Sequence, residues 1–297
     1  MSSAPGAPEI SGRLAIIAGK GRFPVLVAEA ARNKGHEPYI FQIRGEANQD
    51  WSGFDESQIS IADLSAFAAT VRSEGIGSVV LAGGIARRPD LVDIRPTWRS
   101  LWSLIDSFRL VASGGDDKLL RFVINVLENE GVKVLAAQHV APDLLGQAGP
   151  LGHVSPGKAD LKDIAAASGA ALALGRLDIG QGAVSVRGRV IALEGLEGTD
   201  AMLMRVAELR SGGRLASGCG GVLVKLCKPG QDERADLPSI GPDTIINAHA
   251  AGLAGIAIEA GRALVLERDT VVAHADRLGL FVTGIETREE EVDQCPH

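Results

Sequence analysis

Cysteine and aromatic residues are scarce in this sequence. Its 297 residues include three cysteines, and aromatic side chains make up 4%. Three cysteines cannot all pair with one another and no Cys-x-x-Cys motif occurs, so we expect a reducing compartment and no structural zinc site. So few aromatic rings also disfavour a surface on which nucleic-acid bases stack.

Other absences narrow the classes of protein further. No apolar run reaches the roughly 20 residues of a membrane-spanning helix. Residues 1–12 lack the apolar core of a signal peptide and are expected to be a flexible leader. Neither a His-Glu-x-x-His motif nor a Gly-x-Ser-x-Gly turn occurs, which disfavours histidine-held zinc and acyl transfer. We therefore expect a cytoplasmic protein.

Positive charge is in the minority. The net charge is −7 and the pI is about 5.4. Because broad nucleic-acid binding needs a basic surface, we expect no nucleic-acid partner. A local cationic pocket for a phosphate group remains compatible with this charge.

The first half of the chain alternates strand-like and helix-like segments. The expected strands are 14–19, 37–43, 58–64, 78–85 and 132–140, and the expected helices are 23–35, 64–76, 98–110 and 116–131. A repeated strand–helix–strand order predicts a parallel sheet with helices on both faces. We therefore assign residues 13–145 to a Rossmann-like N-terminal domain.

A second domain is expected after a linker. Residues 146–160 are rich in glycine and proline, as is typical of linkers. Residues 161–287 again mix helices and strands, with a hairpin expected around Arg187 and a helix capped by Thr199 or Asp200. The sequence thus predicts an α/β fold with two α/β domains, the second built on a sheet of mixed strand directions.

Two glycine-rich turns follow expected strands of the first domain. One contains Gly19, Lys20 and Gly21, and the other contains Gly83 and Gly84. Ligands of open α/β sheets bind at the carboxyl ends of the strands, and a phosphate can bind at a helix N-terminus. The alternative is a tight turn without a ligand, since Pro24 stands where a dinucleotide fingerprint needs its third glycine.

Acids crowd the turn at residues 194–200. Glu194, Glu197 and Asp200 recur at intervals of three around two glycines. Part of this pattern is ordinary helix capping. Three acids and two glycines exceed what a cap requires, so we interpret the turn as a candidate functional segment.

Cations and carboxylates share the loop at residues 225–244. Lys225 and Lys228 precede Asp232 and Asp236, and prolines and glycines prevent one regular element. Lysines can neutralise phosphate charge, while carboxylates can hold Mg²⁺ or orient water. The loop therefore predicts a phosphoryl-transfer site, with metal binding by two or three of Asp200, Asp232 and Asp236. A solvated surface loop is the alternative.

Four stretches together resemble a known family. Residues 14–35, 178–205, 220–245 and 252–269 are similar to the UDP-2,3-diacylglucosamine pyrophosphatases of lipid A biosynthesis. These are the type found in bacteria that lack the calcineurin-like metallophosphoesterase with the same activity. The resemblance covers about residues 14–287, and its specific part is the C-terminal motifs.

The resemblance implies a Mg²⁺-dependent hydrolase with a cleft between two α/β domains. It would split UDP-2,3-diacylglucosamine into UMP and 2,3-diacylglucosamine 1-phosphate. In it, Asp236 or Asp232 would orient or deprotonate the attacking water, and Lys225 or Lys228 would stabilise the leaving phosphate. The residues expected to contact substrate are the two glycine turns together with Glu197, Gly198, Thr199 and Gln231.

The expected partners follow from such a substrate. A lipid-linked UDP-sugar implies transient contact with the inner membrane surface, and residues 98–108 and 170–175 could line an apolar groove. A homodimer is possible on base rates. Two other classes stay open: a carrier that binds nucleotide sugar or lipid without hydrolysis, and a nicotinamide-dependent oxidoreductase. The acid-rich loops disfavour the carrier, and Pro24 disfavours the oxidoreductase.

Overall fold

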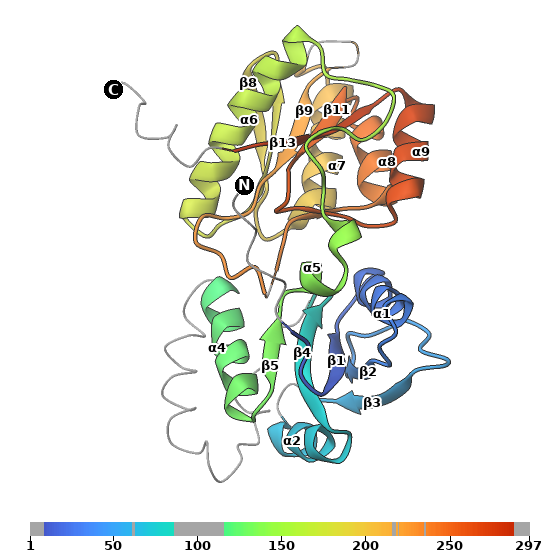
Figure 1. Cartoon of the computed structure of the whole chain (residues 1–297). Helices are drawn as coiled ribbons and strands as arrows, with labels where there is room; N and C mark the ends of the chain where they lie inside the picture. The colour runs from blue at the N-terminus through green and yellow to red at the C-terminus, as the bar shows by residue number, and fades with distance from the viewer. Residues whose placement is uncertain are drawn as a thin grey trace, which may run out of the picture. The chain divides into compact units, whose positions relative to one another are not determined.

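The computed structural model in Figure 1 describes residues 9–60, 63–85, 116–215, 218, 220–234 and 236–287. The chain forms two compact units. Unit 1 comprises residues 1–142 and 232–236, and unit 2 comprises residues 143–231 and 237–297. The expected helix at 98–110 and the apolar segment at 98–108 lie outside the described residues, as do the two ends of the chain.

Unit 1 contains a five-stranded sheet with the strand order β3-β2-β1-β4-β5, and every pairing in it is parallel. This confirms the Rossmann-like class. The strands are β1 (Arg13–Ala18), β2 (Tyr39–Ile43), β3 (Asp55–Ile59), β4 (Ile76–Ala82) and β5 (Lys133–Leu135). The helices are α1 (Phe23–Asn33), α2 (Leu64–Ser73), α4 (Asp116–Asn129) and α5 (Ala137–Val140).

The core of unit 1 follows from side-chain alternation along the strands. Ala15 and Ile17 of β1 share a buried cluster with Phe67 of α2 and with Ile124 and Leu127 of α4. The intervening residues of β1 are buried as well. A strand that is buried on both faces reads as a continuous apolar run, which is why β1 was easy to recognise in the sequence.

Unit 2 contains a six-stranded sheet with the order β6-β13-β11-β9-β7-β8. The strands are β6 (Gly149–Pro150), β7 (Gly182–Val186), β8 (Arg189–Leu193), β9 (Val222–Lys225), β11 (Gly255–Glu259) and β13 (Phe281–Ile285). Strands β9, β11 and β13 are parallel, whereas β6, β7 and β8 pair antiparallel to their neighbours. The predicted mixed sheet and the hairpin at Arg187 are both confirmed.

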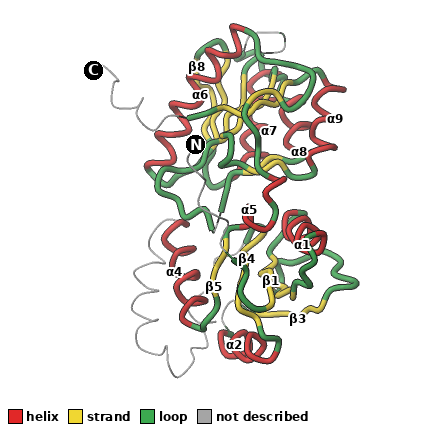
Figure 2. The backbone as a smooth tube through the Cα atoms, in the orientation of Figure 1, coloured by secondary structure: helices red, strands yellow, loops and turns green. Residues whose placement is uncertain are grey.

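Helices cover both faces of this sheet. Figures 1 and 2 show α6 (Lys158–Arg176) on one side of the strands, and α7 (Gly198–Ser211), α8 (Pro242–Ala250) and α9 (Arg268–Leu278) on the other. One buried cluster joins Leu223 and Ile256 to Leu203, Ile245 and Val271. A second cluster joins α6 to the opposite face. A separate pair of short strands, β10 (Ser239–Ile240) and β12 (Leu264–Val265), also belongs to this unit.

Three local expectations were wrong. The strand expected at 58–64 is β3 at Asp55–Ile59, and Leu64 already begins α2. The strand expected at 132–140 ends at Leu135, and Ala137–Val140 form the short helix α5. Small alanines fit either element, so the apolar run alone could not separate them. Helix α7 begins at Gly198, one residue before the expected cap, and its N-cap residue Glu197 makes no side-chain capping bond. The Thr199 hydroxyl instead donates to Glu194.

Candidate functional site

The carboxyl ends of the parallel strands of unit 2 form one edge of its sheet. Strands β9 and β11 end there at Lys225 and Glu259. Because β7 runs antiparallel to β9 and β8 antiparallel to β7, the beginning of β7 and the end of β8 lie at the same edge. The sheet therefore gathers Lys225, Glu259 and the turn after β8 at the edge where open α/β sheets bind ligands.

A buried ionic network occupies this edge. The Lys225 ammonium donates to Thr199 Oγ1 at 2.7 Å and to the Ser239 carbonyl at 3.1 Å, and it lies 3.8 Å from Glu194 Oε1. Thr199 Oγ1 in turn donates to Glu194 Oε1 at 2.5 Å. The side chains of Lys225 and Glu194 are 6% and 8% exposed. Lys225 thus compensates a buried carboxylate and fixes the first turn of α7.

Two glycines let the backbone approach Glu194 closely. A Cβ atom on Gly180 would clash with the Glu194 carbonyl oxygen, and one on Gly182 would lie 2.7 Å from its carboxylate. The backbone N–H of Glu194 donates to the Gly182 carbonyl at 2.9 Å. Glu194 was seen in the acid-rich turn but was not selected as a site residue, since its partners lie on other strands.

Lys228 lies beyond the end of β9 and reaches a different acid. Its ammonium is 2.8 Å from Asp178 Oδ1, and Asp178 has a left-handed backbone with φ of 53°. The Gln231 side-chain oxygen accepts from the Lys228 backbone N–H at 3.2 Å, which closes the turn around Pro229. The structure therefore brings Lys228 and Gln231 together, and it adds Asp178, which sequence reasoning missed.

Glu259 is a second missed carboxylate. It is 4% exposed and accepts from the Cys227 backbone N–H at 2.8 Å and from Thr287 Oγ1 at 2.5 Å. Arg262 also pairs with it at 3.1 Å. Glu259 therefore ties the start of the loop after β9 to the end of β13. A lone acid that ends an apolar strand was the available signal.

The other acids of the turn after β8 are more exposed. Glu197 pairs with Arg205 at 3.1 Å. Asp200 accepts from the Asn247 side-chain amide at 2.9 Å, which links α7 to α8. Gly198 has a φ of 80° and no atom near the place of a Cβ, so its role is conformational. The positive φ of Gly198 therefore bends the chain where α7 begins.

Asp232 and Asp236 belong to unit 1, whereas the lysines, Gln231 and Asp200 belong to unit 2, so the predicted set divides between the units. Within unit 1, Asp232 accepts from Arg234 at 2.7 Å, and Arg234 also pairs with Glu128 of α4 at 2.9 Å. The hydrogen bond from Arg234 lowers the pKa of the Asp232 carboxyl, and the same bond raises the pKa of Arg234. Asp232 is therefore held ionised.

No group of three or more His, Cys, Asp or Glu side chains that could hold a metal ion occurs among the described residues. Both carboxylate oxygens of Asp232 accept from Arg234, so a metal ion would have to share them with that guanidinium. A site of one or two carboxylates completed by water and phosphate oxygens is the arrangement that suits Mg²⁺. Metal binding by two or three of Asp200, Asp232 and Asp236 stays a prediction, since these residues divide between the two units.

In unit 1 the two glycine turns meet each other. Lys20 and Gly84 exchange backbone hydrogen bonds at 2.7 and 3.2 Å, and the Gly19 N–H donates to Ala82. Cβ atoms on Gly19 and Gly83 would collide with the opposite turn. These three N–H groups are therefore engaged, and Lys20 is the cation that the turn offers. Its ammonium lies 3.3 Å from Glu46, a buried acid after β2 that sequence reasoning also missed.

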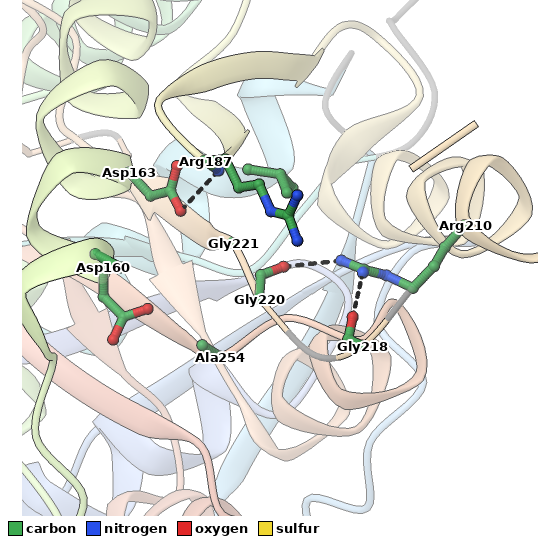
Figure 3. A pocket seen from close by; sticks show the side chains of 10 residues that line it. Asp160, Asp163, Arg187, Arg210, Gly218, Gly220, Gly221 and Ala254 are labelled. Carbon is green, nitrogen blue, oxygen red and sulfur yellow. Dashed lines mark hydrogen bonds between the residues drawn. The ribbon is translucent and has the colours of Figure 1, made fainter. Parts of the chain in front are cut away.

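A pocket of about 220 Å³ lies at the other edge of the unit 2 sheet, near the beginnings of β9 and β11. Figure 3 shows Arg187, Arg210, Asp160 and Asp163 around it. Asp163 is buried and accepts from the backbone N–H groups of Arg187 and Gly188, so it fixes the hairpin turn. The pocket contains none of the predicted site residues.

In the described part of the chain, no helix is both long and apolar enough to cross a bilayer. The fold and the carboxyl-edge network define a two-domain α/β protein whose acids and cations are paired at the carboxyl ends of the parallel strands in its mixed sheet. Models of the two domains of one family match this chain. The LpxI N-terminal domain matches residues 13–144 and the LpxI C-terminal domain matches residues 147–283.

The chain belongs to the LpxI family, as its sequence resemblance predicted. A curated relative, the UDP-2,3-diacylglucosamine pyrophosphatase LpxI of Caulobacter vibrioides, is 41% identical over 278 residues. The match covers 93% of this chain and 99% of that protein. A crystal structure of isoflavone reductase covers 96% of this chain and 81% of its own, at 12% identity and a TM-score of 0.29, too low to bear on fold or function.

Proposed function

We propose that this chain hydrolyses the pyrophosphate bond of UDP-2,3-diacylglucosamine to UMP and 2,3-diacylglucosamine 1-phosphate, as a step of lipid A biosynthesis. The observation that carries the proposal is the 41% identity to a pyrophosphatase over 93% of this chain and 99% of that relative. Identity spread over both domains makes a shared reaction a better account than a shared fold alone.

The chemistry needs a water molecule, one broken bond and two anionic products. The water oxygen bonds to one phosphorus while the bond from that phosphorus to the bridging oxygen breaks. Cations must offset the charge that gathers on the leaving phosphate, and positioning with electrostatics can supply most of the rate enhancement. Lys228, with its side chain 13% exposed, is the better placed of the two loop lysines for this role, because Lys225 is enclosed by Thr199 and Ser239.

We propose different roles for the two carboxylates Asp232 and Asp236 of this loop. Asp236 is exposed on the same loop and is proposed to orient or deprotonate the attacking water. Asp232 is bound by Arg234, and its ionised carboxylate is proposed to fix the loop and to take part in aiming that water. On the substrate side, Lys20 is the proposed contact from unit 1, together with the backbone of its glycine turns.

We also propose that turnover needs a divalent cation, Mg²⁺ in the first instance. The candidates to hold it are two or three of Asp200, Asp232 and Asp236, completed by oxygens of the substrate and of water. A bound cation supplies charge neutralisation on the pyrophosphate oxygens. The support is the carboxylate chemistry of the two loops and the anionic substrate.

The proposed substrate also determines where in the cell we expect the protein to act. A diacylated sugar nucleotide is held by a membrane, so we propose that the protein acts at the cytoplasmic face of the inner membrane of a Gram-negative bacterium and touches that surface transiently. A cleft between the domains and a homodimer stay predictions.

The test is turnover of UDP-2,3-diacylglucosamine by the purified protein with Mg²⁺ and with EDTA. UMP and the sugar 1-phosphate should appear with Mg²⁺ and fall to background in EDTA. Hydrolysis in ¹⁸O-labelled water would show which product carries the new oxygen. Bound substrate without UMP under either condition would replace the proposal by the carrier, for which the comparisons offer no support.

The matched variants are Asp236→Asn and Asp243→Asn. Both acids are exposed and lie in one loop region, but Asp243 opens α8. Asp236→Asn should lower kcat by at least about a thousandfold while substrate binding is retained, because positioning of water contributes at the transition state. Asp243→Asn should stay within about twofold of the parent chain. Loss of substrate binding or of folding in Asp236→Asn would remove Asp236 from the catalytic role.

A further inference from the structure

Large apolar side chains are exposed on the turns beside the network of unit 2. Among the described residues, Leu196 is 93% exposed, Leu177 70%, Ile179 52% and Leu193 43%. These four residues, here called the apolar rim, are half of the eight large apolar side chains that are exposed in the described part of the chain. Single exposed leucines are normal, whereas a gathering of this kind marks an interaction surface.

The two turns that carry the apolar rim touch each other. Leu177 and Ile179 lie between α6 and β7, Leu193 is the last residue of β8, and Leu196 lies between β8 and α7. Strands β7 and β8 pair, with Ala183 opposite Leu193. Beyond that pair, the backbones of Gly180 and Glu194 approach so closely that a Cβ atom on Gly180 would clash. The four side chains therefore flank one backbone contact.

The acids that stand next to the apolar rim in the sequence each have a counter-charge. Asp178, which stands between Leu177 and Ile179, pairs with Lys228 at 2.8 Å. Glu197, which follows Leu196, pairs with Arg205 at 3.1 Å. The exposed Arg176 precedes Leu177 and has no ion-pair partner among the described residues. This surface offers apolar side chains, acids that already carry a counter-charge, and one spare cation for an anionic headgroup.

We propose that the apolar rim is the surface by which unit 2 enters the headgroup region of a lipid bilayer. The inference rests on the proposed function, which places the substrate in a membrane. Leucine side chains inserted at such an interface gain from apolar burial, and arginine gains from anionic lipid. An uncompensated carboxylate would oppose insertion, and the pairing of Asp178 and Glu197 removes that obstacle. The apolar rim borders the Lys228 pair, so insertion brings the reactive edge to the lipid.

The first experiment is flotation of the full-length chain with vesicles of phosphatidylethanolamine and phosphatidylglycerol. The test variant is Leu177→Ser/Leu196→Ser, and the matched control is Leu161→Ser. Leu161 is 54% exposed near the start of α6, roughly 24 Å along the helix axis from Leu177. The double variant should bind vesicles at least about tenfold more weakly than the parent chain, and the control should bind like it.

The second measurement separates membrane contact from substrate binding. Turnover is compared between substrate embedded in the same vesicles and a short-acyl analogue dispersed in water. The double variant should lose at least about tenfold on embedded substrate and stay within about twofold on the analogue. Equal losses on both substrates, with vesicle binding retained, would overturn the proposal and make the apolar rim a binding surface for the substrate's own acyl chains.

Three other results would overturn either the membrane proposal or the proposed function. Unchanged flotation of the double variant would overturn the proposal, and a dimer of the parent chain that the substitutions dissociate would assign the apolar rim to a second copy. A parent chain that floats through the apolar rim but does not hydrolyse the short-acyl analogue would overturn the proposed function and leave the lipid contact standing. Circular dichroism of each variant identifies any loss that comes from unfolding.

Discussion

At the scale of single residues, Glu194 and Lys225 are informative because each compensates the other in a place that water barely reaches. Glu194→Gln should lower the free energy of unfolding by about 3 kcal/mol, since it leaves a buried ammonium without its carboxylate. Glu194→Gln/Lys225→Met should recover most of that loss, because no uncompensated charge remains. Urea unfolding of both single variants and the double variant measures the coupling.

The control for this cycle is the exposed pair of Glu197 and Arg205 in the same turn. Its side chains are 36% and 48% exposed, so Glu197→Gln should change stability by no more than about 0.5 kcal/mol. Additive costs of Glu194→Gln and Lys225→Met would contradict the coupling and would assign both residues to interactions with other partners.

Asp232 gives a prediction on pH. The hydrogen bond from Arg234 lowers the pKa of Asp232 in the folded state, so the pair stabilises the fold above the unfolded carboxyl pKa of about 4 and loses that effect as pH falls through the lowered folded value. The stability gap between the parent chain and Asp232→Asn should therefore be present at pH 7 and shrink as the pH falls below about 4.

Because this pair is partly exposed, the gap at pH 7 should be no more than about 1 kcal/mol. Urea unfolding at several pH values between 7 and 3 measures it, with Asp243→Asn as the reference for loss of an exposed acid. A gap that widens on acidification would show that the folded carboxyl has a raised pKa, opposite to the effect of Arg234.

At the scale of elements, glycines decide how closely β7 and the turn after β8 can pack. Gly180→Ala should destabilise the protein by about 1–3 kcal/mol, because the added Cβ would clash with the Glu194 carbonyl oxygen and push two backbones apart. Gly169→Ala is the control, since Gly169 lies inside α6 with open space around its Cα. It should stabilise the protein by about 0.5–1 kcal/mol. Equal effects of the two substitutions would remove the close approach as the reason for Gly180.

Elements were more predictable than the contacts between them. The apolar run of β1 and the hairpin at Arg187 are local signals, and local signals survive in a sequence. The segment at 132–140 failed because alanine fits strand and helix alike. Glu194 was visible as one acid of a crowded turn, but its importance depends on Lys225, which follows 31 residues later on another strand.

The same limit applies to the rest of the candidate site. Asp178 meets Lys228 across 50 residues, and Glu259 meets the backbone of Cys227 across 32. Both contacts follow from β9 lying between β7 and β11, an order that no local pattern specifies. The sequence therefore identified which loops carry charge, while the pairing of charges required the sheet.

At the scale of the whole molecule, the fold should stand without a metal ion. Each unit has its own apolar core, and no cluster of three or more potential ligands occurs among the described residues. EDTA should therefore abolish turnover while it leaves the melting temperature of the free protein within about 1 °C, because a cation held by one or two carboxylates and substrate oxygens contributes little before substrate arrives.

Substrate with Mg²⁺ should then raise the melting temperature in a saturable way. At a hundredfold excess over Kd, the free energy of unfolding should rise by about 2.7 kcal/mol. Circular dichroism melts and UMP release on the same samples measure both quantities. A fall of several degrees in EDTA alone would mean that the ion is structural, and it would contradict a site that substrate oxygens complete.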